Sequence, residues 1–191
     1  MRESETGLRE RLVDVGAELL AAEGVEALTL REIARRAGVS HGAPRRHFPT
    51  HLELLSAIAR RGFVELADRA TRAVDGVEGP RSQLAALARE YLRFAVDRRG
   101  MYELMFRHDL LKSGHLGLRD TSLPLFGRLV ELVGRVRPDL DARLAGGALW
   151  ANLHGVGQLW GWGSLQLAVG TGDFDRMVEA VLAVHLGPEV A

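Results

Sequence analysis

The chain has 191 residues, and its 25 Lys and Arg residues balance its 25 Asp and Glu residues, so the overall charge does not by itself point to nucleic acid. Cysteine is absent, which excludes disulfides and cysteine-based metal or redox sites. A chain of this length can bury a hydrophobic core and form one or two domains. Because no apolar stretch precedes the first charged residues, we expect no signal peptide and a cytoplasmic location.

The charge is unevenly distributed along the chain. Residues 1–27 hold three Arg against seven Asp and Glu, a net charge of −4, whereas residues 28–63 hold seven Arg against two Glu, a net charge of +5. A local basic block inside a neutral chain is typical of a DNA-binding module. The plainer alternative is a solvated helix face, and charge alone does not separate the two.

The first predicted elements are a polar arm and an amphipathic helix. Residues 1–6 are polar, and we expect them to form a loose arm. Apolar residues then recur at helical spacing from Leu8 to Glu23, and Gly24 is suited to end the helix in a left-handed conformation. This helix is expected to cover the two helices that follow.

A short helix and a tight turn are predicted next. Thr29 is a candidate N-cap, and Glu32 follows three residues later, which is the spacing of a capping box. Leu30, Ile33 and Ala34 recur at helical spacing. Gly38 is expected to be the left-handed residue that ends this helix.

A second short helix is expected from His41 to Phe48, with Ser40 as its N-cap and Pro49 as its stop. Pro44 lacks an N–H, so the first turn of this helix should be distorted or 3₁₀-like. A helix, a glycine-containing turn and a short basic helix together predict a helix-turn-helix, whose second helix enters the DNA major groove.

Over about the first third of the chain, these residues resemble the TetR family of bacterial transcriptional regulators. A weaker match near the C-terminus is similar to the W-H-G pattern of one TetR subgroup. The residues that carry the resemblance are Leu28-Thr29-Leu30-Arg31-Glu32-Ile33-Ala34, Ala37-Gly38-Val39-Ser40, Gly42-Ala43, His47-Phe48-Pro49, Leu54-Leu55 and Trp150-Ala-Asn-Leu-His154-Gly155.

The chain departs from the family at two positions for which the resemblance implies phosphate contacts. The family carries Leu-Tyr where this chain has Pro44-Arg45, and Lys where it has His51. Arg45 can replace the tyrosine hydroxyl as a phosphate donor, and more strongly. His51 is only partly charged near neutral pH.

The expected DNA contacts follow from the helix-turn-helix. Residues at the start of the second helix should lie nearest the base edges, where Gly42 allows close approach and His41 can reach a purine acceptor. The expected base-edge residues are Ser40, His41, Gly42 and Ala43, and the expected phosphate contacts are Thr29, Arg45, Arg46, His47 and His51.

Further helices are predicted along the rest of the chain. A long helix from His51 to Val74 should leave the DNA-binding module, although Gly62 interrupts its apolar stripe. The remaining expected elements are a turn at 75–80, a helix at 81–99 interrupted at Gly100, a short apolar helix at 101–106, a mobile loop at 108–120, a helix at 123–136, and a last helix from Asp173 to Leu186 closed by Gly187-Pro188.

The stretch from Leu144 to Gly172 contains no charged residue. Its glycines and amide side chains argue against a membrane span, and a helix that is uncharged all round is typically buried on two sides. One side would face its own domain and the other a partner subunit. Gly147, Ala151 and Gly155 form a ridge of small residues that lets a second helix approach closely, so a homodimer is expected.

Aromatic and soft side chains of the second module are candidates for an effector pocket. A small apolar or aromatic molecule would fit them, because an apolar cavity with a few polar tips is what such a site needs. The alternative for each residue taken singly is ordinary core packing. The candidates are Tyr91, Phe94, Tyr102, Met105, Phe106, Phe126, Trp150, His154 and Gln158.

Catalytic and metal motifs are poorly supported. His47 and His51 have metal-like spacing, but Pro49 between them prevents a shared helix face. The glycine pairs near residue 155 follow no predicted strand, so they do not indicate a nucleotide site. We therefore expect no cofactor and no enzyme.

Taken together, the sequence predicts an all-α protein of about nine helices, with no convincing strand alternation. A helix-turn-helix DNA-binding domain is expected at 1–50 and a helical effector-binding and dimerisation domain at 51–191. The predicted function is a dimeric repressor that binds a palindromic operator in double-stranded DNA and is released by a small-molecule effector. A ligand-independent DNA-binding regulator and a helical enzyme are the alternatives.

Overall fold

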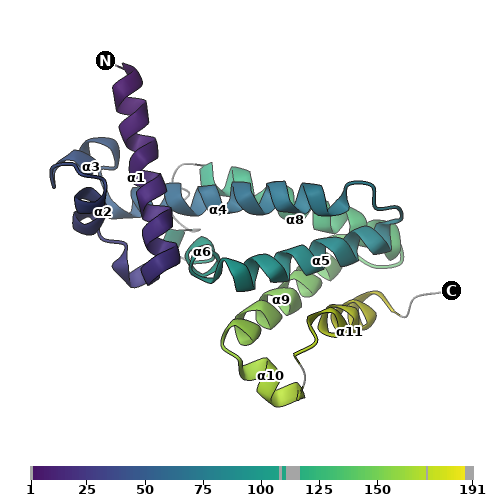
Figure 1. Ribbon diagram of the computed structural model, residues 1–191. Coiled ribbons are helices and arrows are strands. Elements are labelled where there is room, and N and C mark those ends of the chain that lie inside the picture. Colours follow the sequence, from purple (N-terminus) through teal and green to yellow (C-terminus); the bar gives the residue numbers. More distant parts are fainter. Residues whose placement is uncertain (1, 108, 111–116, 171, 188–191) are drawn as a thin grey trace. The chain divides into compact units, whose positions relative to one another are not determined.

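Helices make up most of the chain that the computed structural model describes, which is residues 2–107, 109–110, 117–170 and 172–187. These residues contain ten α-helices, one short 3₁₀ helix and no strand (Figure 1), which confirms the all-α prediction. The helices are α1 Arg2–Glu23, η1 Val25–Ala27, α2 Leu30–Arg36, α3 Ala43–His47, α4 His51–Val74, α5 Pro80–Asp97, α6 Arg99–Met105, α8 Leu118–Val136, α9 Ala142–Gly161, α10 Ser164–Val169 and α11 Phe174–Leu186.

The chain divides into two compact units. Unit 1 comprises residues 1–64 and 98–121, and unit 2 comprises residues 65–97 and 122–191. Helix α4 contributes its first part to unit 1 and its last part to unit 2. The sequence-based division falls after residue 50, whereas unit 1 extends to residue 64 and also includes residues 98–121, which contain α6.

Unit 1 has a core of aliphatic and aromatic side chains from α1, α2, α4 and α6, and α2 and α3 both contact α1. Gly62, predicted to interrupt the stripe of α4, is buried at a close approach instead. A Cβ placed there would lie 2.5 Å from Met105 Sδ and 2.6 Å from Met101 Cγ. A Cβ at Gly100 would lie 2.9 Å from the Leu20 carbonyl oxygen. Both glycines thus let α6 approach its neighbours.

Three predicted boundaries are wrong. The loose arm at residues 1–6 is helical from Arg2, so α1 is longer than the Leu8–Glu23 helix predicted. The break before α6 falls at Arg98 (φ −119°, ψ 39°) rather than at Gly100, since Gly100 is helical. Helix α8 begins at Leu118 rather than at residue 123, so it includes residues 118–120 of the predicted loop. Within that loop, residues 108 and 111–116 lie outside the described residues.

Unit 2 packs α9 against α5, α10 and α11. Its core includes Leu92, Leu149 and Val178. Aspartates cap two of its helices, because Asp141 accepts from the Leu144 N–H (3.0 Å) and Asp173 accepts from the Arg176 N–H (3.1 Å). The second of these caps is the one predicted for the last helix.

The charge-free stretch is divided into two helices by Gly163, which adopts φ 76° between α9 and α10. Its apolar side chains are only partly covered within the chain, since Leu144, Trp162 and Leu167 are exposed. In the part of the chain that the structure describes, no helix has both the length and the apolar character needed to cross a bilayer.

Candidate nucleic-acid interface

The start of α2 forms half of the predicted capping box. Thr29 adopts an extended conformation, and its Oγ1 accepts a hydrogen bond from the Glu32 N–H at 3.2 Å. The return bond is absent, because the Thr29 N–H donates to the Ala27 carbonyl (2.8 Å). The Glu32 carboxylate instead accepts hydrogen bonds from Arg35 and Arg36. The helix therefore begins where predicted, with its glutamate used differently.

The turn after α2 is a Schellman motif centred on Gly38. Gly38 adopts φ 66°, as predicted for a left-handed residue. Its N–H donates to the Arg35 carbonyl (3.2 Å), and the Val39 N–H donates to the Ala34 carbonyl (3.0 Å). These two bonds satisfy carbonyls at the end of α2 and fix the direction in which the chain proceeds to α3.

Helix α3 is shorter than predicted and begins at Ala43 rather than His41. Ser40 is not its N-cap, since Gly42 occupies that position without a side-chain capping bond. The Ala43 N–H closes a turn onto the Ser40 carbonyl (2.9 Å), which agrees with the distortion expected from Pro44. Proline fits the first helical turn because its missing N–H is not needed there, so the regular helix starts beside it.

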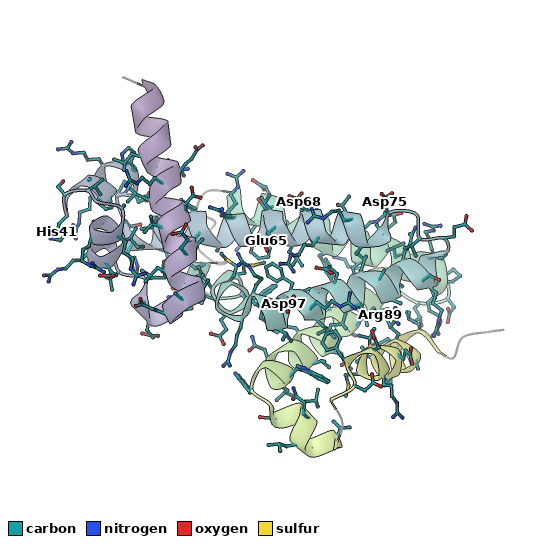
Figure 2. The ribbon with its side chains drawn as sticks, viewed as in Figure 1. His41, Glu65, Asp68, Asp75, Arg89 and Asp97 are labelled. Carbon is teal, nitrogen blue, oxygen red and sulfur yellow. The ribbon has the colours of Figure 1, made fainter. Side chains whose placement is uncertain are left out.

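Most of the predicted DNA contacts are accessible. Pro44 and Phe48 are buried and attach α3 to its unit, and the Arg9 guanidinium lies 4.9 Å from the centre of the Phe48 ring. His41, labelled in Figure 2, lies in the exposed turn before α3. The predicted contacts that are exposed are Thr29, Ser40, His41, Gly42, Arg45, Arg46 and His51, and those that are half-buried are Ala43 and His47.

The arginines of α2 are held by acidic partners. Arg35 donates to both oxygens of Glu32, from Nε at 2.8 Å and from Nη2 at 2.6 Å. Arg36 Nε donates to the same carboxylate at 2.8 Å, and its Nη2 pairs with Glu23 of α1. The hydrogen bonds from Arg35 and then Arg36 lower the pKa of Glu32 to about 2, so this carboxylate stays ionised.

The arginines of α3 have no such partners. Neither Arg45 nor Arg46 forms an ion pair with any residue of the described chain, and both are exposed. Arg31 on α2 shares this state, although the sequence did not single it out as a contact. The sequence signal available for Arg31 was its place in the first turn of α2, two residues after the Thr29 N-cap, which is itself a predicted phosphate contact. Positive charge without an internal counterion is what a phosphate-binding surface requires.

His51 is the first residue of α4, and its ring already has a protein partner. Its Nε2 forms a hydrogen bond with the Leu28 carbonyl, which must accept, so Nε2 carries the proton. Thr50 caps the same helix, because its Oγ1 accepts from the Glu53 N–H at 3.2 Å. Of the predicted phosphate contacts, His51 and Thr29 thus both have side chains that are hydrogen-bonded to backbone groups of their own unit.

The predicted effector residues fall into both units. Tyr102, Met105 and Phe106 belong to unit 1, where Tyr102 and Met105 are buried and Phe106 makes an edge contact with Phe63 at 5.6 Å between ring centres. Phe94 of unit 2 is fully buried, with the Arg69 guanidinium 5.4 Å from its ring centre. Phe94 is therefore packed as an ordinary core residue, which was the alternative to an effector contact.

Unit 2 brings together the polar side-chain atoms of three predicted effector residues, Tyr91, Trp150 and His154. The Trp150 Nε1–H donates to the Tyr91 hydroxyl (3.2 Å), and that hydroxyl lies 3.0 Å from His154 Nδ1. Burial lowers the pKa of His154, which favours the neutral ring and a hydrogen bond from the Tyr91 O–H to Nδ1. Phe126 lies 6.1 Å from Trp150 between ring centres, and Gln158 is half-buried on the turn of α9 that follows His154.

A shallow groove of about 470 Å³ runs between α9, α10 and α11. Its floor is apolar and includes Val156, Leu165 and Val181. Ala151 and Gly155 of the predicted ridge line it, and no atom lies within 4 Å of a Cβ built on Gly147 or Gly155. This face of unit 2 is therefore open within a single chain. Among the described residues, no cluster of His, Asp or Glu is arranged to hold a metal ion.

Comparison with known proteins gives consistent matches. The family described as bacterial regulatory proteins, tetR family, matches residues 12–58, and the tetracyclin repressor-like C-terminal domain matches residues 84–185. The HTH-type transcriptional regulator BetI of Rhizobium meliloti is 35% identical over 85 residues, which is 44% of this chain and 42% of that protein. This match covers less than half the length of that relative.

Two further matches extend over most of the chain. An HTH-type transcriptional repressor of Mycobacterium tuberculosis is 29% identical over 164 residues, covering 84% of this chain and 76% of that one. A solved structure of a protein with unknown function from Rhodococcus sp. RHA1 is 30% identical with a TM-score of 0.80, covering 94% and 93% of the two chains. The likeness therefore includes both the helix-turn-helix and the helices that follow it.

Proposed function

Since the chain belongs to the TetR family of bacterial regulatory proteins, whose members are regulators rather than enzymes, we propose that it is a DNA-binding transcriptional repressor. It binds a palindromic operator as a homodimer, and a small apolar or aromatic effector releases it. The observation that carries this proposal is the exposed pair Arg45 and Arg46, which has no ion-pair partner among the described residues and follows the Schellman turn at Gly38.

The DNA contacts divide into two kinds. Arg45 and Arg46, with Thr29 and His47, bind phosphates and so give affinity that falls with salt. The exposed turn at Ser40, His41 and Gly42, with Ala43, meets the base edges and so gives sequence preference. The exposed Arg31 adds a phosphate contact that sequence reasoning missed.

The homodimer forms through the open face of α9 and α11. Its support is the apolar groove, the ridge at Gly147, Ala151 and Gly155, and the exposure of Leu159 and Val184 beside it. Two copies of this face would cover apolar surface that a single chain leaves in water. A two-fold dimer presents two copies of α3, so its operator has two matching half-sites.

The effector binds near the Trp150–Tyr91–His154 chain in unit 2. These three side chains supply oriented hydrogen bonds beside the Phe126 ring. Multiply charged molecules are disfavoured, because few charged side chains accompany these residues and unpaired charges would be costly to bury. Effector binding lowers operator affinity by about 5–150-fold if the coupling has the usual size for allosteric proteins.

DNA selection tests the proposal most broadly. The full chain is incubated with random-sequence duplexes, and the bound fraction is sequenced. The proposal predicts a two-fold symmetric motif. Enrichment of no sequence, or of a motif with a single half-site, contradicts it.

Sedimentation of Ala151→Trp tests the dimer. Adding bulk at the ridge should separate the subunits, whereas Ala21→Trp at an exposed site of α1 should not. A wild-type monomer at micromolar concentration, or an Ala151→Trp dimer as stable as wild type, rules out this interface.

Fluorescence tests the effector. Trp150 is one of three tryptophans, so the other two are replaced by Phe before aromatic compounds are titrated. The proposal predicts quenching together with release of DNA. Quenching with unchanged DNA affinity supports the alternative, a regulator that works without an effector.

A further inference from the structure

We infer that His51 is a positioning residue that closes the helix-turn-helix, rather than a phosphate contact. Its Nε2–H donates to the Leu28 carbonyl across 23 residues of sequence. Leu28 directly precedes the Thr29 N-cap of α2, and His51 opens α4 immediately after α3. The hydrogen bond thus joins the two ends of the segment 29–50, which contains α2, the turn and α3. This inference rests on the proposed DNA-binding function.

Both ends of this bond lie on fixed parts of unit 1. Leu28 is 1% exposed, and its N–H donates to the Val25 carbonyl at 3.1 Å. His51 lies in the first turn of α4, whose start is capped by Thr50. A bond between two fixed points restrains the segment between them, because the segment can tilt only if one anchor moves or the bond breaks.

The hydrogen bond also limits what else the imidazole can do. Nε2 is the outer nitrogen of the ring and the one best placed to reach outward to a phosphate, yet it donates to a backbone carbonyl. A phosphate contact through Nε2 would need that carbonyl to lose its donor. The chain has Arg45, Arg46 and Arg31 exposed for phosphates, so the imidazole is not needed for that purpose.

The consequence for DNA concerns recognition more than charge. With the bond broken, α3 keeps its two exposed arginines but loses part of the restraint on its orientation. Affinity for the preferred sequence then falls, because base contacts need an oriented helix. Affinity for arbitrary DNA stays nearly constant, because it depends on charge alone.

Three variants of the full chain separate the two roles. His51→Ala removes the donor, His51→Gln keeps an amide N–H donor at a similar distance from the backbone without a charge, and His47→Ala removes an imidazole of α3 that has no bond to Leu28. Each is titrated with the duplex that wild type selects from a random library and with a scrambled duplex of equal length. Titrations at several salt concentrations are run well below the unfolding temperature.

We expect His51→Ala to bind the selected duplex about threefold to tenfold more weakly, the range for one net hydrogen bond. Its binding to the scrambled duplex and its salt slope should match wild type, and His51→Gln should bind both duplexes as wild type does. His47→Ala should weaken binding to both duplexes alike. Equal losses in His51→Ala and His51→Gln with flattened salt slopes would establish a phosphate contact and overturn the inference, as would wild-type binding by His51→Ala.

Hydrogen exchange of the DNA-free protein tests the restraint by itself. Amides of residues 29–50 should exchange faster in His51→Ala than in wild type or His51→Gln, while amides of α9 remain unchanged. Identical exchange in all three proteins overturns the inference. If wild type selects no duplex, the proposed function fails, and the exchange result still decides whether His51 restrains the segment.

Discussion

Helices α2 and α3 are neighbours that each carry two consecutive arginines in the last turn, but the two pairs differ in their ion-pair partners. The pairs are Arg35 and Arg36 in α2 and Arg45 and Arg46 in α3. Glu32 precedes the first pair by three and four residues, so it lies on the same helix face and accepts from both guanidinium groups. No acidic residue lies within α3, and its arginines remain exposed without an ion pair among the described residues.

The difference teaches that local arginine content does not identify a DNA-binding helix. The α2 arginines pair with acidic residues of their own unit, Glu32 with both and Glu23 of α1 with Arg36. Only cations without internal partners bring net positive charge to a phosphate. The charge of the two helices therefore has two functions, one internal and one directed outward.

The largest effect is expected at Arg45. Arg45→Ala should weaken binding to all DNA sequences alike, by roughly tenfold, because a hydrogen bond to a charged group is lost. The salt dependence should flatten by about one unit of slope for each phosphate contact removed. Titrations of several duplexes over a salt series measure both quantities. A changed sequence preference with an unaltered slope would mean that Arg45 reads bases instead.

Capping is the second difference, since Thr29 caps α2 whereas α3 has no side-chain cap. Thr29→Ala should lower the free energy of unfolding by about 1 kcal/mol. Urea unfolding at neutral pH measures this change, with Ser40→Ala as the matched control. An equal loss in Ser40→Ala would show that Ser40 stabilises α3 after all.

Removing the carboxylate that pairs with the α2 arginines should make the charge of α2 more like that of α3. Glu32→Gln removes the shared carboxylate, so the net positive charge of the unit rises by one. We expect tighter binding to scrambled DNA and a salt slope steeper by up to about one unit. Titration of a scrambled duplex with wild type and Glu32→Gln measures the change. An unaltered slope would show that the α2 arginines lie too far from DNA to contribute.

The smallest expected effect concerns acid. The folded-state pKa of Glu32 is about 2, below its ordinary value of 4.5. A depressed carboxyl pKa contributes stability that is present above pH 4.5 and is lost as the pH falls toward 2. Wild type should therefore lose slightly more stability than Glu32→Gln over that interval, as measured by thermal unfolding. Parallel curves for the two proteins would contradict the assigned hydrogen bonds.

Local signals in the sequence predicted much of the fold. Gly38 and Asp173 occupy their predicted capping positions, because each acts within one helical turn of its own residue. The start of α3 was misplaced, since Ser40 matches an N-cap by type while Pro44 decides where regular helix begins. Gly100 was misread because its role depends on the Leu20 carbonyl, which is distant in sequence.

The candidate sites were harder to predict for the same reason. The spacing of Glu32, Arg35 and Arg36 on one helix face was visible, but the pairing of Arg36 with Glu23 needed the packing of α1 on α2. The Tyr91–His154 contact spans 63 residues and joins α5 to α9. The His51–Leu28 hydrogen bond likewise has no signal in the sequence, where His51 was considered as a phosphate contact and, with His47, as a pair of metal-like spacing.

The most direct test compares the binding of two double variants to the duplex that wild type selects. The α3 double variant combines Arg45→Ala and Arg46→Ala, and the α2 double variant combines Arg35→Ala and Arg36→Ala. Both remove two positive charges per chain, so a purely global charge effect would lower the salt slope equally. We predict that the α3 double variant loses about two units of slope per chain bound, and that the α2 double variant keeps a slope close to wild type. Equal slopes for the two variants would contradict the division of charge between α2 and α3.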